Sequence, residues 1–142
     1  MTAQDAAGRL PVFVYGTLRP GRCNHALLLR GRTVAEVPAR LPGAVLYEGP
    51  GYPYAVAEEG AAGVRGELIT LAPEAYARVL AALDALEEYR PGDPQSLYVR
   101  VVREVRVAGG GPVACWVYLA AEPVARRLRA SGRRLPGGEW TG

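Results

Sequence analysis

Residues 12–21 read VFVYGTLRPG, a run of β-branched and aromatic residues that stops abruptly at a glycine. The first half, bounded by Pro11 and Gly16, predicts a buried strand, and the second half predicts a loop. A strand that ends at such a turn leaves backbone N–H groups without partners in the sheet, and these groups can bind a carboxylate or a developing oxyanion. Gly16 also permits a close approach that a side chain would forbid. The alternative is an ordinary turn between a strand and a loop.

Outward from this stretch, the chain predicts more strands than helices. Strands are predicted at 32–38, in two short runs within 44–60, and at 64–71, 96–107 and 112–120. Helices are predicted at 25–30, with Asn24 as its cap, at 73–88 and at 122–131. Strands and helices do not alternate regularly, so the pattern indicates an α+β fold with a curled sheet or a small barrel.

The chain has 142 residues, of which 49% are apolar, enough for one substantial core. We therefore expect a single domain over residues 1–142, with flexible ends at 1–10 and 136–142. No run approaches the roughly 20 apolar residues that span a bilayer, and the N-terminus lacks a secretory signal pattern. Cys23 and Cys115 have no metal-ligand spacing. A cytoplasmic protein with two free thiols, away from membranes, is the simplest expectation.

All 17 basic residues are arginine, and the net charge is +3. A group near the C-terminus predicts a solvated helix face followed by a tail: Arg126, Arg127, Arg129, Arg133 and Arg134. Arginine also suits phosphate recognition. The chain nevertheless carries no helix-turn-helix, zinc-finger or aromatic RNA-binding pattern, so we expect no nucleic-acid partner.

A carboxylate interrupts the apolar face of the helix predicted at 73–88. On a helical wheel, Glu87 falls inside the apolar stripe and Glu88 points away from it. The stripe is formed by Tyr76, Val79, Leu80, Leu83 and Leu86. A carboxylate in such a position must be paired, hydrogen-bonded or shifted to a higher pKa. Three readings follow: the helix ends before Glu87, an arginine pairs with Glu87, or Glu87 is a functional acid or base.

Several motifs, taken in order, resemble the γ-glutamylcyclotransferase superfamily, including its AIG2-like and BtrG-like branches. They are YGTLRPG at 15–21, VRGELITL at 64–71, LDALEEYR at 83–90 and LYVR at 97–100. The ending LPGGEW at 135–140 is also similar to that of bacterial relatives. The resemblance covers most of residues 12–119 and implies a small mixed β-barrel flanked by short helices. It also implies a reaction without cofactor or metal, in which the α-amino group of a γ-glutamyl amide attacks its own γ-carbonyl and releases 5-oxoproline and an amine.

The resemblance further implies which residues form the site. The glutamate of LDxxE corresponds to Glu87, which would act as general base and then general acid. Substrate binding would fall to the residues of the YGxL loop and to one strand residue: Tyr15, Gly16, Thr17, Leu18 and Tyr98. Glu88 stands where the family often has glycine, and it would either add charge at the pocket rim or face solvent.

The implied partner is a small γ-glutamyl substrate, but the chain indicates neither the leaving amine nor an oligomeric state. Arg100 alternates onto the same strand face as Tyr98, and Asp84 is the carboxylate that it would pair with. The alternative function is a non-catalytic module on the same fold, which binds a small molecule or another protein.

Overall fold

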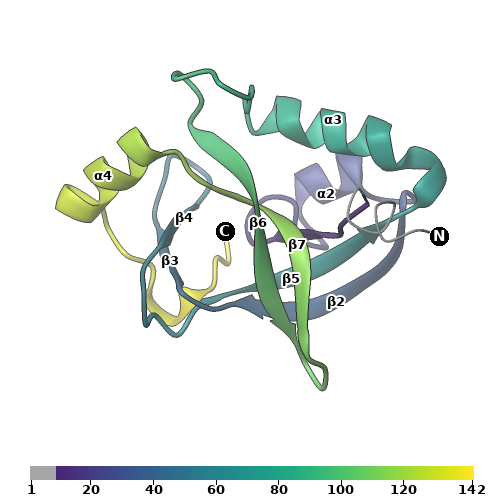
Figure 1. The fold of residues 1–142 in the computed structure, drawn as a ribbon, viewed down its shortest axis with the longest axis horizontal. Coiled ribbons are helices and arrows are strands. Elements are labelled where there is room, and N and C mark those ends of the chain that lie inside the picture. The colour runs from purple at the N-terminus through teal and green to yellow at the C-terminus, as the bar shows by residue number, and fades with distance from the viewer. Residues whose placement is uncertain (1–8) are drawn as a thin grey trace.

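The computed structural model describes residues 9–142 and contains a closed five-stranded β-barrel (Figure 1). Around the barrel the strands follow the order β1-β5-β2-β6-β7. Their bounds are Val12–Val14 for β1, Thr33–Leu41 for β2, Val64–Leu71 for β5, Tyr98–Val107 for β6 and Pro112–Ala120 for β7. Neighbouring strands are antiparallel, except that β1 and β7 pair in parallel and close the barrel. The predicted small mixed barrel is confirmed.

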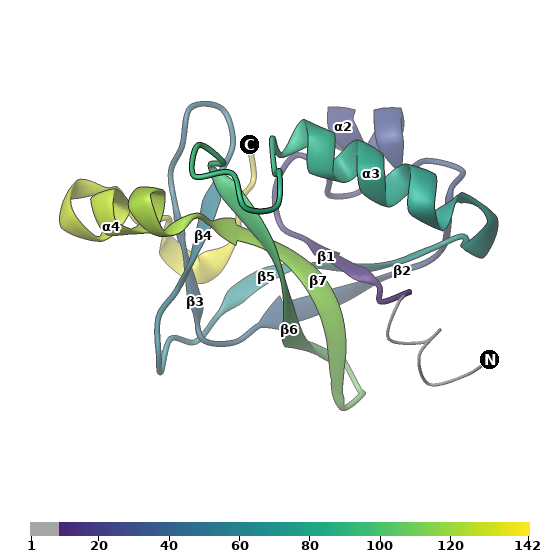
Figure 2. The ribbon, with the colours of Figure 1, turned by 45° about the horizontal axis from the view of Figure 1, so that its top comes forward.

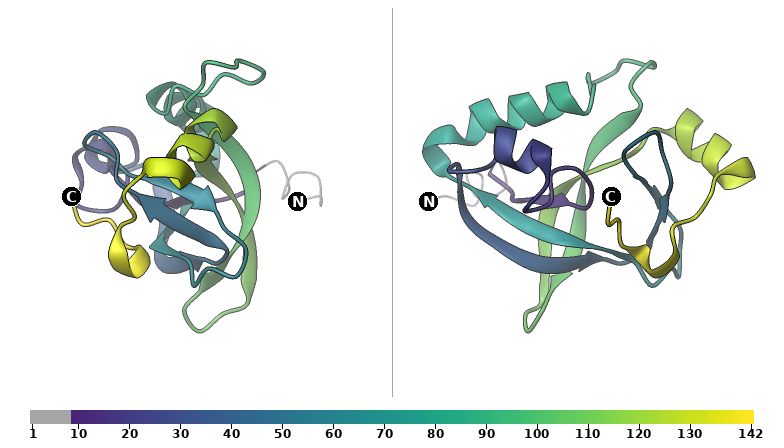
Figure 3. Two further views of the ribbon diagram at one scale, coloured as in Figure 1. Left: turned by 90° about the vertical axis from the view of Figure 1, so that its left-hand side faces the viewer. Right: turned by 180° about the vertical axis from the view of Figure 1, so that it is seen from behind.

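The remaining elements lie around the barrel. They are the hairpin of β3 (Ala44–Tyr47) and β4 (Tyr54–Ala57), the helices α2 (Cys23–Leu28), α3 (Tyr76–Leu86) and α4 (Glu122–Ser131), and the 3₁₀ turns η1 (Pro73–Ala75) and η2 (Pro136–Gly138). Helices α2 and α3 lie side by side on one flank, whereas α4 lies at the far end beside the β3–β4 hairpin (Figures 1 and 3). Short helices around a closed barrel confirm the α+β fold class.

Apolar residues that alternate along the strands separate into two buried clusters. One cluster comes almost entirely from strands and includes Phe13, Val105 and Val117. The other joins the strands to α3 through Val79 and Leu83. Because α3 buries this face on the barrel, its last turn is held at a defined place, and that turn carries Glu87.

A single glycine allows the short strand β1 to pair within the barrel. A Cβ atom on Gly66 would lie 2.0 Å from the carbonyl oxygen of Val14, so no larger residue fits there. The pairing matters for the site because β1 leads directly into the loop that begins at Tyr15.

Strand β2 is longer than the sequence indicates. The prediction ended it at Pro38, but β2 continues to Leu41 and pairs with β5 along this whole stretch. Pairing between β2 and β6 starts only at Ala39, so residue 38 has no partner strand on that side and a proline is tolerated as on an edge.

The first helix also differs from its prediction. Helix α2 begins at Cys23, and Arg22 stands at its N-cap without a side-chain hydrogen bond. Asn24 therefore lies inside the helix, and its Nδ2 donates to Thr17 Oγ1 at 2.8 Å. The predicted cap is wrong because this side chain bonds to the loop after β1 rather than to its own backbone.

The C-terminal segment packs against the barrel, where the sequence predicts a loose tail. Arg19 Nη1 donates to the carbonyl oxygen of Trp140 at 2.9 Å, and Arg19 Nη2 lies 3.0 Å from Glu139 Oε2. Trp140 is partly buried against the strand cluster. These partners are about 120 residues apart in the chain, so no local sequence pattern predicts the contact. The prediction for residues 1–8 lies outside the described residues.

The structure also bears on two expectations from the sequence, the free cysteines and the lack of a membrane span. Cys23 is exposed, Cys115 is buried, and both are free thiols. Among residues 9–142, no helix combines the length and the apolar character that crossing a membrane would require.

Candidate active site

A cavity of about 330 Å³ opens where the loop after β1, the end of α3 and the start of β6 meet. Figure 2 shows these segments converging, with the loop after β1 passing below the end of α3. The walls are formed by Phe13, Val14, Tyr15, Gly16, Thr17, Leu18, Asn24, Tyr52, Pro53, Leu86, Glu87, Glu88, Leu97, Tyr98 and Tyr118. All six residues that the sequence analysis names for the site, Glu87 and five binding residues, therefore lie around one cavity.

Glu87 stands immediately after the last residue of α3. Its backbone N–H still donates to the carbonyl oxygen of Leu83 at 3.0 Å, so the helical register extends through Glu87. The side chain is half-buried and lines the cavity. Burial raises the pKa of Glu87 from 4.5 to about 7.

No arginine neutralises this carboxylate. Among residues 9–142, the ion pairs do not include Glu87, and its side chain has no hydrogen-bond partner there. Of the three readings open at the sequence level, a buried ion pair is therefore wrong for the described residues. The cavity wall therefore includes a carboxyl group whose pKa burial raises to about 7.

The loop after β1 lines the same cavity. Within residues 9–142, the N–H groups of Gly16, Thr17 and Leu18 donate to no other backbone group, while the carbonyl oxygen of Gly16 closes a turn by accepting from Arg19 N at 3.0 Å. A Cβ atom on Gly16 would lie 2.9 Å from Pro53 Cδ. The glycine therefore lets the loop approach Pro53, and the free amides remain available for an anionic group.

Arg19 fixes the far side of this turn. Its Nε and Nη2 donate to the two carboxylate oxygens of Glu67 on β5 at 2.9 and 3.0 Å. The same guanidinium binds Glu139 and the carbonyl of Trp140, as described above. The loop is thus held to the barrel and to the C-terminal segment by one partly buried side chain, which keeps the amides in place before any ligand arrives.

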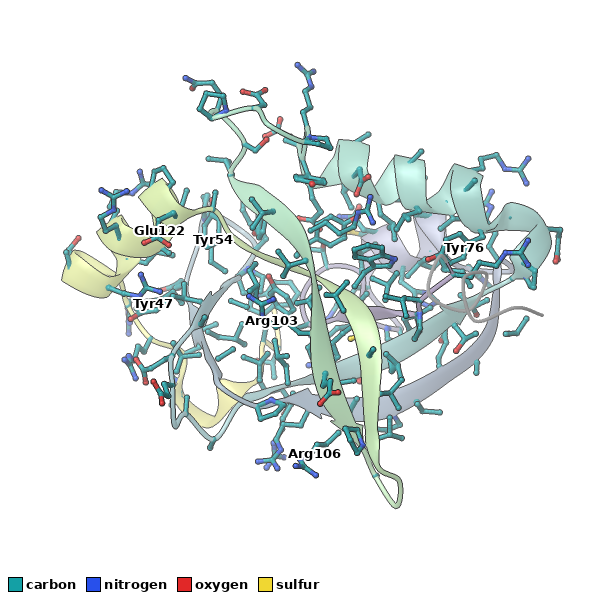
Figure 4. All side chains as sticks on the ribbon, in the orientation of Figure 1. Tyr47, Tyr54, Tyr76, Arg103, Arg106 and Glu122 are labelled. Carbon is teal, nitrogen blue, oxygen red and sulfur yellow. The ribbon has the colours of Figure 1, made fainter. Side chains whose placement is uncertain are left out.

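Tyrosines form the inner wall. Tyr98 OH donates to the carbonyl oxygen of Pro53 at 2.8 Å, and Tyr15 OH donates to the carbonyl oxygen of Tyr118. Burial raises the pKa of Tyr15 and of Tyr98 far above the ordinary value, so both stay neutral. Tyr54, which is labelled in Figure 4, stacks on Tyr98 with ring centroids 4.9 Å apart.

A second set of bonds ties the end of α3 to the barrel. Arg100 Nε and Nη2 donate to Asp84 Oδ1 and Oδ2 at 2.8 and 3.2 Å, which confirms the predicted pair. Tyr118 OH donates to Asp84 Oδ1 at 2.6 Å. Arg100 also lies over the Trp116 ring, 4.3 Å from its centroid. Since Asp84 precedes Glu87 by one turn, this network sets where the Glu87 carboxylate points.

Several cavity residues were not predicted. Asn24, Tyr52, Pro53 and Tyr118 all reach the cavity from other parts of the chain. The sequence predicts Asn24 as a helix cap, and no sequence motif connects any of these four residues with Glu87. The one available signal is the cluster of glycine and proline around residue 52. It indicates an irregular turn, but it does not show that this turn packs next to Glu87.

Glu88 combines the two alternatives that the sequence left open, a place at the pocket rim and exposure to solvent. The helical wheel points it away from the apolar stripe, yet Glu88 lies on the rim of the cavity. The helix ends at Leu86, and Glu88 adopts a φ of 54°, so a helical projection no longer describes its direction. The side chain is exposed and at the same time lines the opening.

No group of three or more His, Cys, Asp or Glu side chains suited to a metal ion occurs in the described part of the chain, residues 9–142. The charged groups around the cavity are two carboxylates, Glu87 and Glu88. These carboxyl groups can transfer protons, and the backbone amides and neutral hydroxyls of the lining residues can form hydrogen bonds.

Comparison with known proteins places the chain among related sequences. Residues 12–142 match the family model described as gamma-glutamyl cyclotransferase, AIG2-like. A curated relative is the gamma-L-glutamyl-butirosin B gamma-glutamyl cyclotransferase of Niallia circulans, which is 35% identical over 109 residues. That match covers 76% of this chain but only 65% of the relative's length.

Solved structures show the same fold. An AIG2-like protein from mouse superimposes with a TM-score of 0.60 at 25% identity, covering 79% of this chain and 77% of the mouse chain. A protein from Arabidopsis thaliana gives a TM-score of 0.61 at 28% identity, covering 93% of this chain and 69% of its own.

Proposed function

Because the chain belongs to the gamma-glutamyl cyclotransferase, AIG2-like family, we propose that it converts a γ-glutamyl amide into 5-oxoproline and a free amine at this cavity. The α-amino nitrogen of the substrate attacks its own γ-carbonyl carbon. A new C–N bond closes a five-membered ring, and the old C–N bond to the leaving amine breaks. One amide replaces another, so the reaction needs neither an oxidant nor a cofactor.

Glu87 carries the protons in this proposal. The attacking nitrogen starts as an ammonium group and loses two protons by the time it is part of the ring amide. The leaving nitrogen gains two protons and departs as an ammonium ion. The transfers are successive, so one carboxyl group with a pKa of about 7 can accept each proton and pass it on. General acid–base help of this kind contributes about 10²–10⁴-fold in rate.

The loop of Gly16, Thr17 and Leu18 has the complementary role. When the nitrogen attacks, the γ-carbonyl oxygen becomes an oxyanion, and backbone N–H groups that are free of protein partners can donate to it. The same amides can hold the substrate's α-carboxylate. The loop is prepared for either contact because Arg19 and Glu67 hold it from behind.

The tyrosine wall shapes the substrate. The reaction is intramolecular, so the protein mainly has to fold the γ-glutamyl chain until its nitrogen meets its carbonyl. Tyr15 and Tyr98 are fixed by hydrogen bonds to backbone carbonyls, which makes the wall rigid. A rigid pocket of about 330 Å³ matches a small substrate rather than a polymer.

One observation carries the proposal: an unpaired carboxyl group of raised pKa shares a small cavity with free backbone amides. The test is to incubate the purified protein with γ-glutamyl amino acids, γ-glutamyl-ε-lysine, glutathione and simple γ-glutamylamines, and to measure 5-oxoproline. We expect release by the wild type and a loss of about 10²–10⁴-fold in Glu87→Gln. Glu74→Gln, which removes an exposed carboxylate near the other end of the helix, is the matched control.

The pH profile gives an independent check. Since ionised Glu87 is the base, kcat/KM should rise with pH, reach half of its maximum near pH 7, where half of the carboxyl groups are ionised, and level off at higher pH. Wild-type protein that binds the compounds without turning any of them over would contradict the enzyme and favour the alternative of a small-molecule-binding module on the same fold.

A further inference from the structure

Glu88 lies where the proposed active-site cavity borders a second one. The second cavity has a volume of about 640 Å³, and its wall includes Asp84, Glu88, Arg90 and Asp93. Glu88 lines both cavities. A substrate whose γ-glutamyl part occupies the first cavity would therefore extend its leaving group past this side chain.

The backbone of Glu88 is held in an unfavourable conformation. Its φ of 54° makes it the one non-glycine residue with positive φ among residues 9–142. Glycine adopts this conformation freely, whereas it is unfavourable for a residue with a Cβ atom. The chain thus carries a charged side chain at a position where glycine would be better for folding.

The charge of Glu88 is also left without a protein partner. No salt bridge or side-chain hydrogen bond within residues 9–142 includes its carboxylate. Its neighbours differ in this respect, because Asp84 is bonded to Arg100 and Tyr118, and Asp93 accepts from the backbone amide of Gln95 at 2.9 Å. Within residues 9–142, Glu88 is therefore an unpaired carboxylate at the border of the two cavities.

No positive side chain balances it in the first cavity, whose charged residues are Glu87 and Glu88. In the second cavity Arg90 is the cation, and it is exposed. A leaving group with its own carboxylate would approach Glu88 against like charge. A leaving group with a second positive charge would be attracted at the same point.

We propose that Glu88 selects γ-glutamyl amides whose leaving amine carries an additional positive charge, and disfavours those whose leaving amine carries a carboxylate. This inference rests on the proposed cyclotransferase function and adds the class of leaving group to it. Glu88 acts on specificity, while Glu87 performs the proton transfers.

The test uses three substrates of equal length that differ in one terminal group. They are γ-glutamyl-1,4-diaminobutane, which ends in an ammonium, γ-glutamyl-pentylamine, which ends in a methyl, and γ-glutamyl-5-aminopentanoate, which ends in a carboxylate. The readout is the ratio of kcat/KM for the cationic substrate to kcat/KM for the neutral one. We expect this ratio to fall about fivefold in Glu88→Gln, as expected for one charge pair about 4 Å apart in water.

The control is Glu74→Gln, which removes one exposed carboxylate near the start of α3, at the opposite end of the helix from Glu88. It should leave the ratio of kcat/KM values as in the wild type. The carboxylate substrate should change in the opposite direction and gain relative to the neutral one in Glu88→Gln. Raising the salt from about 0.05 M to about 0.5 M should shrink the wild-type preference and have little effect on that of Glu88→Gln.

The outcomes separate the two proposals. If the wild type releases 5-oxoproline and Glu88→Gln keeps the wild-type ratio, the selection by Glu88 is wrong and the enzyme function stands. If the wild type releases nothing from any of the three substrates or from the wider γ-glutamyl panel, the cyclotransferase function itself is contradicted, and the role of Glu88 falls with it.

Discussion

Asp84 and Arg100 form a two-point ion pair, with Nε–Oδ1 at 2.8 Å and Nη2–Oδ2 at 3.2 Å, that ties the last turn of α3 to β6. Tyr118 on β7 bonds to the same carboxylate. The proposed proton-transfer residue, Glu87, follows three residues later, so its position depends on contacts made by a side chain that does not line its cavity. This relationship gives the first prediction.

Replacing Asp84 with asparagine should both destabilise the protein and impair turnover. The pair is partly buried, with about a fifth of each side chain exposed, so its loss should lower the free energy of unfolding by about 2 kcal/mol. Urea unfolding measures this change. In the same variant kcat should fall more than KM rises, because the Glu87 carboxylate is misplaced rather than the substrate site removed.

The comparison for this prediction is Arg129→Gln. Arg129 pairs with Glu122 at the surface, and 44% and 66% of the two side chains are exposed. Its removal should cost about 0.5 kcal/mol or less and leave kcat unaffected. Similar losses in the two variants would show that the Asp84 pair has no special role.

Adding one methyl group to the loop after β1 should impair activity. In Gly16→Ala the new Cβ atom would meet Pro53 Cδ at 2.9 Å, so the loop or the proline must move. We expect a loss of about 1–3 kcal/mol in stability and a drop in kcat/KM, because the amides that face the cavity shift with the loop. Gly111→Ala, where nothing lies within 4 Å, is the control and should behave as the wild type. Equal activity of the two alanine variants would rule out a positioning role for this loop.

The raised pKa of Glu87 predicts how stability depends on pH. The pKa is about 7 in the folded protein and ordinarily 4.5, so between these values the folded chain binds more protons than the unfolded chain. The free energy of unfolding must then fall as the pH rises through this window. Glu87→Gln removes the penalty, so it should gain stability over the wild type between pH 5 and pH 8, by at most about 3 kcal/mol. A stability difference that stays constant with pH would contradict the burial of this carboxylate.

Glu88→Gly should make the protein more stable. Glycine relieves the positive φ at this position, and part of the gain is offset by the greater freedom of glycine in the unfolded chain. We expect an increase of up to about 1 kcal/mol in thermal or urea unfolding experiments. Glu74→Gly lies in a right-handed turn and should show the opposite sign. A loss of stability in Glu88→Gly would mean that the side chain has a structural role.

The sequence by itself determined the residues whose pattern is local. Helical periodicity put Glu87 next to the apolar face of α3. The helix ends at Leu86, as one of the three readings expected, but the Glu87 N–H still donates to the carbonyl oxygen of Leu83 and keeps Glu87 close to that face. The strand before Gly16 and the free amides after it were likewise readable, since a strand that meets a glycine turn loses its partners whatever surrounds it. These features depend on neighbours within a few residues in the chain.

Only the tertiary structure decided the rest. The strand order β1-β5-β2-β6-β7, with β1 parallel to β7, depends on pairings between distant segments. The same holds for the cavity wall, to which Asn24, Tyr52 and Tyr118 come from three separate elements or loops. It also holds for the tail, whose Glu139 meets Arg19 across 120 residues. Side-chain packing and buried ion pairs select among such long-range arrangements, and they act only once the chain has closed, so no local pattern records them.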